Sequence, residues 1–143
     1  MSEHIVKAFT EQLESLANTV AQMGGLAEAQ FANAIEAIAK RDGKLAEAAI
    51  GSDERVDRCQ QTIEEQALKL LALRQPMAVD LRATLAAIKI ANELERIGDL
   101  AKNIGKRALV LNREPPIRLT QSLARMGRQA PPQLAMVLDR YLD

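Results

Sequence analysis

The stretch ATLAAIKIANELERIGDLAKNIGKRALVL, residues 83–111, decides the fold class, because its apolar side chains recur at alternating spacings of four and three. This period places them on one face of an α-helix and is typical of a helix packed against other helices. The apolar line consists of Ala83, Ala87, Ile90, Leu94, Ile97, Ala101, Ile104, Ala108 and Leu111. Because so many of these residues are alanines, we expect the neighbouring helices to approach closely.

Two segments before this stretch show the same period. The first ends at KRDGK, residues 40–44; the second is interrupted near IGSD, residues 50–53, and ends before Pro76, which disfavours helical geometry at the preceding residue. Their apolar lines are Phe9, Leu13, Leu16, Val20, Met23, Ala27, Phe31, Ile35 and Ile38, and then Val56, Cys59, Ile63, Ala67 and Leu70. An antiparallel three-helix bundle is therefore predicted. Its helices should span about 5–40, 44–74 and 78–112.

The composition of the chain supports this all-α prediction. Its 143 residues are about the size of one domain, 48% are hydrophobic and only 2% are aromatic, whereas sandwiches and barrels use many Val, Tyr and Trp. The 19 basic and 19 acidic residues leave no net charge, which argues against a nucleic acid or an anionic membrane as partner. The chain has neither a signal peptide nor an apolar run of about 20 residues, and Cys59 is the only cysteine. We therefore expect a cytoplasmic protein without membrane insertion.

The segment 119–143 is similar to the first predicted helix. Shifted by 103 positions, Leu16, Val20, Met23, Gly24, Ala27, Phe31, Ile35 and Ile38 fall on Leu119, Leu123, Met126, Gly127, Ala130, Leu134, Leu138 and Tyr141. We interpret this as an internal repeat whose second copy stops after its first helix, with a break at Pro131 and Pro132. The predicted organisation is a three-helix bundle over 1–114, followed by a linker and one helix-like segment of an incomplete second repeat over 115–143.

A second line on the third predicted helix changes from apolar to polar. It runs, at the same spacings, through Leu81, Leu85, Ile88, Asn92, Glu95, Asp99 and Asn103. The second predicted helix carries Asp53 and Asp57, which are spaced like Glu95 and Asp99. On facing helices the four carboxylates would lie within reach of one patch, because a helix turn rises about 5.4 Å and packed helices lie about 8–10 Å apart. Such oxygen ligands suit iron in carboxylate clusters, Mg²⁺, Mn²⁺ or Ca²⁺, so a hard-metal site is predicted.

Ordinary structural roles for these carboxylates remain open. Random placement of 19 acidic residues in 143 gives roughly two or three pairs four residues apart, and the chain has three. Asp53 follows Ser52 at a predicted helix start, where a carboxylate interacts favourably with unbonded amides. Alternative partners of Glu95 and Asp99 on a solvated face are Lys89, Arg96 and Lys102.

Catalytic functions are limited by the single histidine, His4, near the N-terminus. A Ser-His pair, a Cys-His pair and a Glu-x-x-His di-iron site all need a histidine that the rest of the chain does not supply. A carboxylate-metal enzyme on a helical bundle, such as a ferritin-like oxidase or a phosphate-ester hydrolase, stays open as a second hypothesis. We favour a non-enzymatic protein, because such an enzyme needs a general base or nitrogen ligand beside the metal.

Three stretches of the chain resemble one protein family. They are TVAQMGGLAEAQFANAI (19–35), RQPMAVDLR (74–82) and ANELERIGDLAKNIGKRAL (91–109). Together they resemble, in order and over nearly the whole chain, the PhoU family of phosphate-regulon regulators. The resemblance implies two tandem three-helix bundles, each with Glu/Asp-x-x-x-Asp motifs on two helices that bind multinuclear metal clusters in some members. Asp53 with Asp57 and Glu95 with Asp99 match the two motifs of the first bundle, and Asn103 matches the family's asparagine one turn further on.

The resemblance also implies a function. Proteins of this family are cytoplasmic negative regulators of the phosphate regulon that modulate phosphate uptake and link the ATPase of the phosphate ABC transporter to a sensor histidine kinase. The implied cofactor is iron, with Mn, Mg, Zn or Ca as alternatives. This chain departs from the family because most of the second bundle, with its acidic motifs, is absent. The apolar residues of the incomplete repeat should therefore dock on a second copy and form a homodimer.

Overall fold

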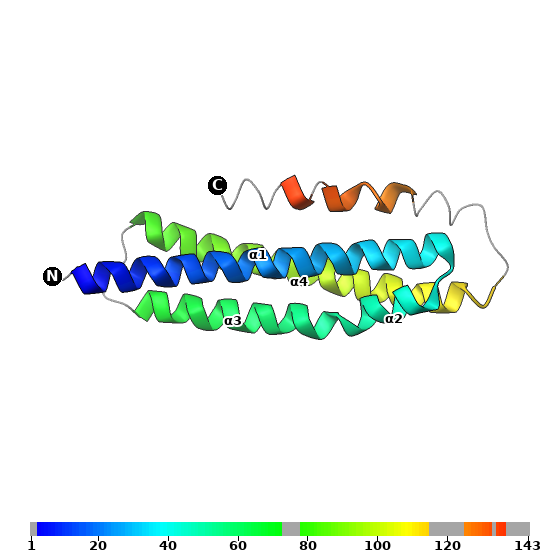
Figure 1. Cartoon of the computed structure of the whole chain (residues 1–143), viewed down its shortest axis with the longest axis horizontal. Helices are drawn as coiled ribbons and strands as arrows, with labels where there is room; N and C mark the ends of the chain where they lie inside the picture. The colour runs from blue at the N-terminus through cyan, green and yellow to red at the C-terminus, as the bar shows by residue number, and fades with distance from the viewer. Residues whose placement is uncertain (1–2, 73–77, 115–124, 133, 137–143) are drawn as a thin grey trace.

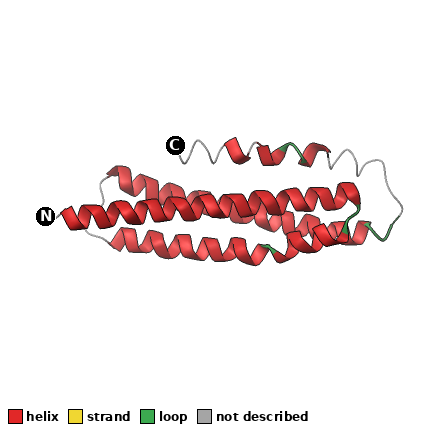
Figure 2. Ribbon diagram, viewed as in Figure 1, coloured by secondary structure: helices red, strands yellow, loops and turns green. Residues whose placement is uncertain are grey.

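The computed structural model describes residues 3–72, 78–114, 125–132 and 134–136 (Figure 1). The main elements in these ranges are the helices α1 (Glu3–Lys40), α2 (Gly43–Gly51), α3 (Asp53–Ala72) and α4 (Ala78–Leu111). Figure 2 shows helices and loops but no strand in the described part of the chain, which confirms the all-α prediction. The predicted end of the second helix at Pro76 lies outside the described ranges. None of the described helices is both long and apolar enough to cross a membrane.

The predicted interruption of the second helix is confirmed at Ser52, which separates α2 from α3. Asp42 caps α2, because its carboxylate accepts hydrogen bonds from the backbone N–H groups of Lys44 (2.9 Å) and Leu45 (3.3 Å). The preceding residue, Arg41, has a φ of 53°, a left-handed conformation that ends α1 where KRDGK predicts its end. The helices α2 and α3 then continue in nearly one direction as a single arm of the bundle (Figure 1).

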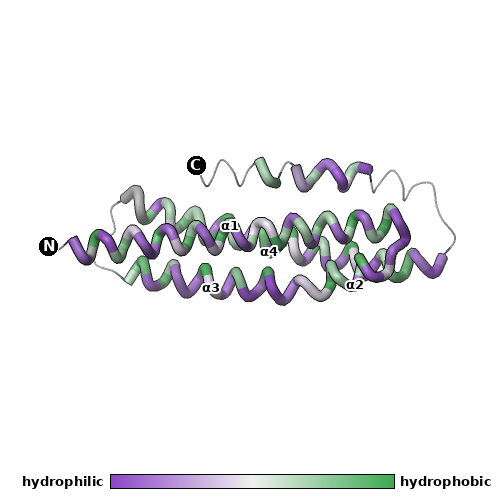
Figure 3. Tube along the Cα trace, viewed as in Figure 1, coloured by the Kyte–Doolittle hydropathy of each residue, from purple (hydrophilic) through white to green (hydrophobic). Residues whose placement is uncertain are grey.

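The core lies between α1, the arm formed by α2 and α3, and α4, all of which pack against one another. Hydrophilic and hydrophobic residues alternate along each helix in Figure 3, as amphipathic helices of a bundle require. The predicted apolar residues that are buried include Leu16, Val20, Met23 and Ala27 on α1, Val56, Cys59, Ile63, Ala67 and Leu70 on α3, and Ala87, Leu94, Ala101 and Ala108 on α4. The period read from the sequence therefore identifies most of the core.

On α4 the buried line differs from the predicted one. Ala83 is exposed, whereas Ile90, Ile97 and Ile104 are half-buried beside the core. The buried line is Thr84, Ala87, Ala91, Leu94, Gly98, Ala101, Gly105 and Ala108. A Cβ atom added at Gly105 would lie 3.0 Å from the carbonyl oxygen of Ala46, so α4 approaches α2 this closely only because Gly105 has no side chain. The predicted close approach is confirmed, but glycines and alanines make it, with the isoleucines at the sides.

The described part of the C-terminal segment lies alongside α1 (Figure 1). Arg128 forms an ion pair with Glu36 on α1, with 2.5 Å between Nε and Oε1, and Leu134 packs against the main core cluster. A turn at 128–129 separates two short helical turns, because Pro131 has no N–H to donate to the preceding turn. The helical pattern is thus interrupted at 128–129, just before the predicted position, and Pro131 and Pro132 themselves lie in a short helical turn. Met126 remains 68% exposed. The other residues of the predicted repeat, Leu119, Leu123, Leu138 and Tyr141, lie outside the described ranges.

Candidate functional site

The four predicted acidic residues face one another across the packed helices α3 and α4. Asp53 and Asp57 lie in the first two turns of α3, and Glu95 and Asp99 lie near the middle of α4. Asp53 is only 5% exposed, Asp57 and Glu95 are half-buried, and Asp99 is exposed. The structure therefore brings Asp53, Asp57, Glu95 and Asp99 together in what we call the acidic patch.

Burial and mutual repulsion both raise the pKa of two members of the acidic patch. Burial raises the pKa of Glu95 above its ordinary value, and a hydrogen bond with Asp99 and the negative charges of Asp99, Asp57 and Asp53 raise it further. The pKa of Asp57 is also raised, first by burial and then by the charges of Asp53 and Asp99, while Lys102 acts in the opposite direction. Burial together with neighbouring negative charge therefore disfavours the charged form of both carboxyl groups.

Asp53 is the anchor of the patch. Its Oδ1 accepts a hydrogen bond from Nε2 of Gln30 at 3.3 Å, and its Oδ2 lies 3.6 Å from Nζ of Lys102. The same Nε2 of Gln30 also donates to the carbonyl oxygen of Ala49 at 2.9 Å. Asp53 does begin a helix, as the sequence suggests, but the contacts of its carboxylate come from α1 and α4. Its position is therefore set by tertiary contacts.

Gly98 leaves the space that Asp53 occupies. A Cβ atom added at Gly98 would lie 3.1 Å from Oε1 of Gln30, 3.3 Å from Oδ1 of Asp53 and 3.3 Å from Cγ1 of Val56. These distances are tighter than ordinary van der Waals contact, so a side chain at this position would push against the Gln30–Asp53 pair. Oε1 of Gln30 is buried without a hydrogen-bond partner in the described structure. The two hydrogen bonds of Gln30 are therefore both donated by its Nε2, one to Ala49 at the end of α2 and one to Asp53.

Two of the cations that the sequence offers as alternative partners of Glu95 and Asp99 pair with other carboxylates. Arg96 lies 3.5 Å from the carboxylate of Glu93, one turn away on the same helix, and Lys102 pairs with Asp53. Glu95 and Asp99 are therefore not neutralised by these two candidate cations, which leaves their charges to act on each other.

The line that contains Asn103 lies mostly on the surface of α4. Leu81 and Leu85, the apolar start of that line, are exposed, Leu85 by 52%, so the line lies on the surface along most of its length. The core of α4 is formed by the neighbouring line of small residues, so the line that changes from apolar to polar runs beside the core. Asn103 is exposed and lines a shallow cavity of about 400 Å³ with Lys106 and Arg107. Asn103 therefore lies next to the basic side chains of Lys106 and Arg107, one turn beyond Asp99.

The donor chemistry of the acidic patch fits a hard cation. All four groups offer carboxylate oxygens, and a bound cation would relieve the repulsion that adds to burial in raising the pKa values of Asp57 and Glu95. As they stand, no three His, Cys, Asp or Glu side chains in the described ranges are arranged to hold a metal ion. The residues thus supply suitable atoms in one neighbourhood without forming a closed ligand set.

Two residues that shape the patch were missed from the sequence, Gln30 and Gly98. Gln30 falls on the buried line of α1 between Ala27 and Ala34, and a polar residue at such a position signals a buried hydrogen bond. Gly98 lies inside a helical pattern, where a glycine often marks close packing. Both signals are local, but neither tells which partner lies opposite.

Comparison with known proteins places this geometry in a family. Residues 20–108, more than half of the chain, match the PhoU domain. A protein of Caulobacter vibrioides called phosphate-specific transport system accessory protein PhoU homolog is 54% identical over 142 residues, which are 99% of this chain and 62% of that protein. Proteins named in the same way from Xylella fastidiosa and Serratia marcescens are 40% and 39% identical over 89% and 99% of this chain, and 52% and 58% of their own lengths. The chain thus spans less than two thirds of the length of these relatives.

Proposed function

The chain belongs to the PhoU family, and from this premise we propose that it is a regulatory adaptor in phosphate signalling. It acts in the cytoplasm as a negative regulator of the phosphate regulon and a modulator of phosphate uptake. Its partners are the ATPase of the phosphate ABC transporter and a phosphate-sensing histidine kinase. The observation that carries this proposal is the 54% identity, over 99% of the chain, to a relative named as a transport accessory protein.

The proposed role is that of a binding protein without catalytic activity. A carboxylate-metal enzyme would need a general base or nitrogen ligand at the acidic patch, and the single histidine of the chain, His4, is exposed near the start of α1. The partners of Asp53 are instead the amide of the buried Gln30 and the ammonium group of the half-buried Lys102. Neither group is suited to accept a proton near neutral pH, since Lys102 is a cation when paired with Asp53.

The acidic patch is proposed to bind one or more hard metal ions, iron first and Mn, Mg, Zn or Ca as alternatives. Asp53, Asp57, Glu95 and Asp99 would hold the metal, and Asn103 is an additional ligand in this proposal. A bound metal would supply positive charge that offsets the repulsion among these carboxylates. The chain's own contribution is to position Asp53 through Gln30 and Lys102, so that one ligand is ordered before the metal arrives.

The proposal includes a homodimer. Leu100 on α4 is 53% exposed, and it lines an apolar cavity of about 190 Å³ with Phe31, Ile97 and Leu134. Apolar surface of this kind on α4 and on the C-terminal segment favours docking of a second copy. Light scattering at micromolar concentration should give twice the mass of the chain, and a strictly monomeric mass would contradict the proposal.

A reporter of the phosphate regulon tests the regulatory function. The chain should lower reporter expression under phosphate-rich conditions when it is produced in a bacterium that lacks its own PhoU-family protein. Purified chain should also retain the transporter ATPase or the cytoplasmic part of the sensor kinase on an affinity column. Unchanged reporter expression together with no retention of either partner, from folded protein, would contradict the proposal.

The enzymatic alternative is tested separately. Protein loaded with iron or manganese should show no oxygen consumption and no hydrolysis of phosphate esters above the rate of the free metal. Turnover that is lost in Asp99→Ala, with the bundle still folded, would replace the adaptor by an enzyme.

A further inference from the structure

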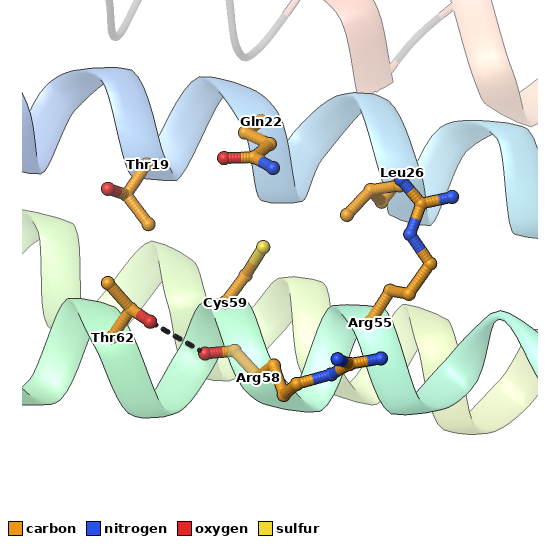
Figure 4. Close-up of a pocket in the computed structure, with 7 residues that line it drawn as sticks. All are labelled: Thr19, Gln22, Leu26, Arg55, Arg58, Cys59 and Thr62. Atoms are coloured by element: carbon orange, nitrogen blue, oxygen red, sulfur yellow. Dashed lines mark hydrogen bonds between the residues drawn. The ribbon is translucent and has the colours of Figure 1, made fainter.

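The side of α3 that faces away from the acidic patch borders a second cavity. Its volume is about 310 Å³, and it lies between α1 and α3. Figure 4 shows its lining side chains, which are Thr19, Gln22 and Leu26 from α1 and Arg55, Arg58, Cys59 and Thr62 from α3. We call it the basic cavity. Its size is at the lower end of the range for small-ligand sites.

Both arginines of the basic cavity have most of their hydrogen-bond donors available. Arg55 forms no hydrogen bond and no ion pair with any residue that the structure describes. Arg58 donates only its Nε–H, to the backbone carbonyl of Glu54 at 3.4 Å, so its terminal N–H groups stay free. Two guanidinium groups thus border one cavity, and none of the carboxylates in the described ranges lies within ion-pair distance of either.

The other polar groups of the cavity leave this excess of positive charge in place. The hydroxyl groups of Thr19 and Thr62 donate to the carbonyl oxygens of Ser15 and Arg58, each at 3.0 Å, so their hydrogens are already used. Gln22 is exposed and its amide can donate, while Leu26 gives the cavity an apolar wall. In Figure 4 the side chain of Arg55 rises from α3 toward Leu26, and that of Arg58 runs along α3. The available donors therefore come from both helices that border the cavity.

We propose that the basic cavity binds a small tetrahedral oxyanion of the phosphate class. Guanidinium groups offer paired N–H donors that match two oxygens of a phosphate, and two of them can serve different oxygens of the same ion. Gln22 supplies a neutral donor from the opposite helix, and the open side of the cavity lets the anion keep part of its hydration. None of the residues that line the basic cavity belongs to the acidic patch, so the result of a test of one site does not decide the other.

Inorganic phosphate itself is the probe for the test. Titration of phosphate at constant ionic strength, followed by ¹H–¹⁵N NMR, should shift the amide and side-chain signals of Arg55, Arg58 and Gln22 in a saturable way. The double variant Arg55→Gln/Arg58→Gln should lower the affinity at least tenfold. The matched control is Arg96→Gln, an exposed arginine on α4 that pairs with Glu93 and should leave the affinity unchanged.

A second measurement reports the occupied cavity directly. Cys59 is the only cysteine of the chain, is 8% exposed and lines the basic cavity, so its alkylation by iodoacetamide follows access to this space. Saturating phosphate should slow the alkylation at least twofold in the wild type and in Arg96→Gln, but not in the double arginine variant. Equal NMR shifts with chloride, equal affinity in the double variant, or unchanged alkylation would overturn the proposal.

Discussion

The two sides of α3 carry opposite charge. Asp53 and Asp57 lie four residues apart and approach the carboxylates of α4, whereas Arg55 and Arg58 border the cavity between α3 and α1. The chain as a whole has no net charge. Since successive residues of a helix are rotated by about 100°, a short run of alternating acids and bases separates into two faces. A neutral composition can therefore contain both a cation site and an anion site.

The two sides also differ in burial, and hence in energetic cost. Asp53 is buried and Asp57 and Glu95 are half-buried, so repulsion among them is poorly screened. Burial first, and the neighbouring carboxylates second, raise the pKa of Asp57 and of Glu95. Arg55 and Arg58 are exposed and keep their hydration. We therefore expect changes on the acidic side to alter stability, and changes on the basic side to alter ligand binding with little effect on stability.

Metal addition should give the largest effect on the acidic side. A metal present at 100 times its dissociation constant should stabilise the folded protein by about 2.7 kcal/mol and raise its melting temperature, because it binds only the folded state. Asp99→Asn should remove most of this shift while leaving the metal-free protein as stable or slightly more stable. Differential scanning calorimetry with and without each metal measures both effects. A shift that survives both Asp99→Asn and Asp57→Asn would place the metal elsewhere.

A side chain at Gly98 should disrupt the anchor of the acidic patch. Gly98→Val places atoms against Gln30, Asp53 and Val56, and we expect a loss of about 1–3 kcal/mol in the free energy of unfolding. Gly25→Val is the matched control, since a Cβ at Gly25, also inside a long helix, meets no atom within 4 Å. Urea denaturation of both variants measures the difference. Equal stability of the two variants would show that the space at Gly98 does not matter.

The pH dependence of stability should reveal the repulsion in the acidic patch. A carboxyl group whose pKa is raised in the folded state binds its proton more tightly there, so it favours folding as the pH falls. For Asp57 and Glu95 this gain should develop between their raised pKa values and the ordinary ones of 3.8 and 4.5, and be complete below those. The variant Asp57→Asn/Glu95→Gln should therefore be more stable than the wild type at pH 7, and the difference should shrink toward pH 4. Urea titrations at both pH values, without metal, measure it; a difference independent of pH would contradict the assignment.

The smallest effect should come from the basic side. Without phosphate, Arg55→Gln and Arg58→Gln should change the free energy of unfolding by no more than about 0.5 kcal/mol, because both side chains are exposed and neither forms an ion pair in the described structure. Thermal unfolding in a phosphate-free buffer measures this. A loss comparable to that of Gly98→Val would mean that the arginines hold the bundle together, and would remove the contrast between the two sides.

The sequence by itself determined the helical elements and most of the core. The spacing of apolar residues identifies the three arms, KRDGK ends α1, and the residues around Ser52 interrupt the second arm, as the structure confirms. It also selected Asp53, Asp57, Glu95 and Asp99, which the structure brings into one patch. These features depend on helix period, capping and turn chemistry, which act between residues a few positions apart and can be read along the chain.

Only the tertiary structure decided which faces meet and how closely. A glycine inside a helix hints at close packing, but the line through Gly98 and Gly105 and the isoleucine line beside it could each face the core until the approach distance of the helices is known. The same holds for Gln30, which reaches Asp53 across 23 positions, and for Arg55 and Arg58, whose cavity exists only because α1 lies opposite. Hydrogen bonds, cavities and charge repulsion depend on distances between helices, and these distances result from packing small residues against small residues across the whole bundle.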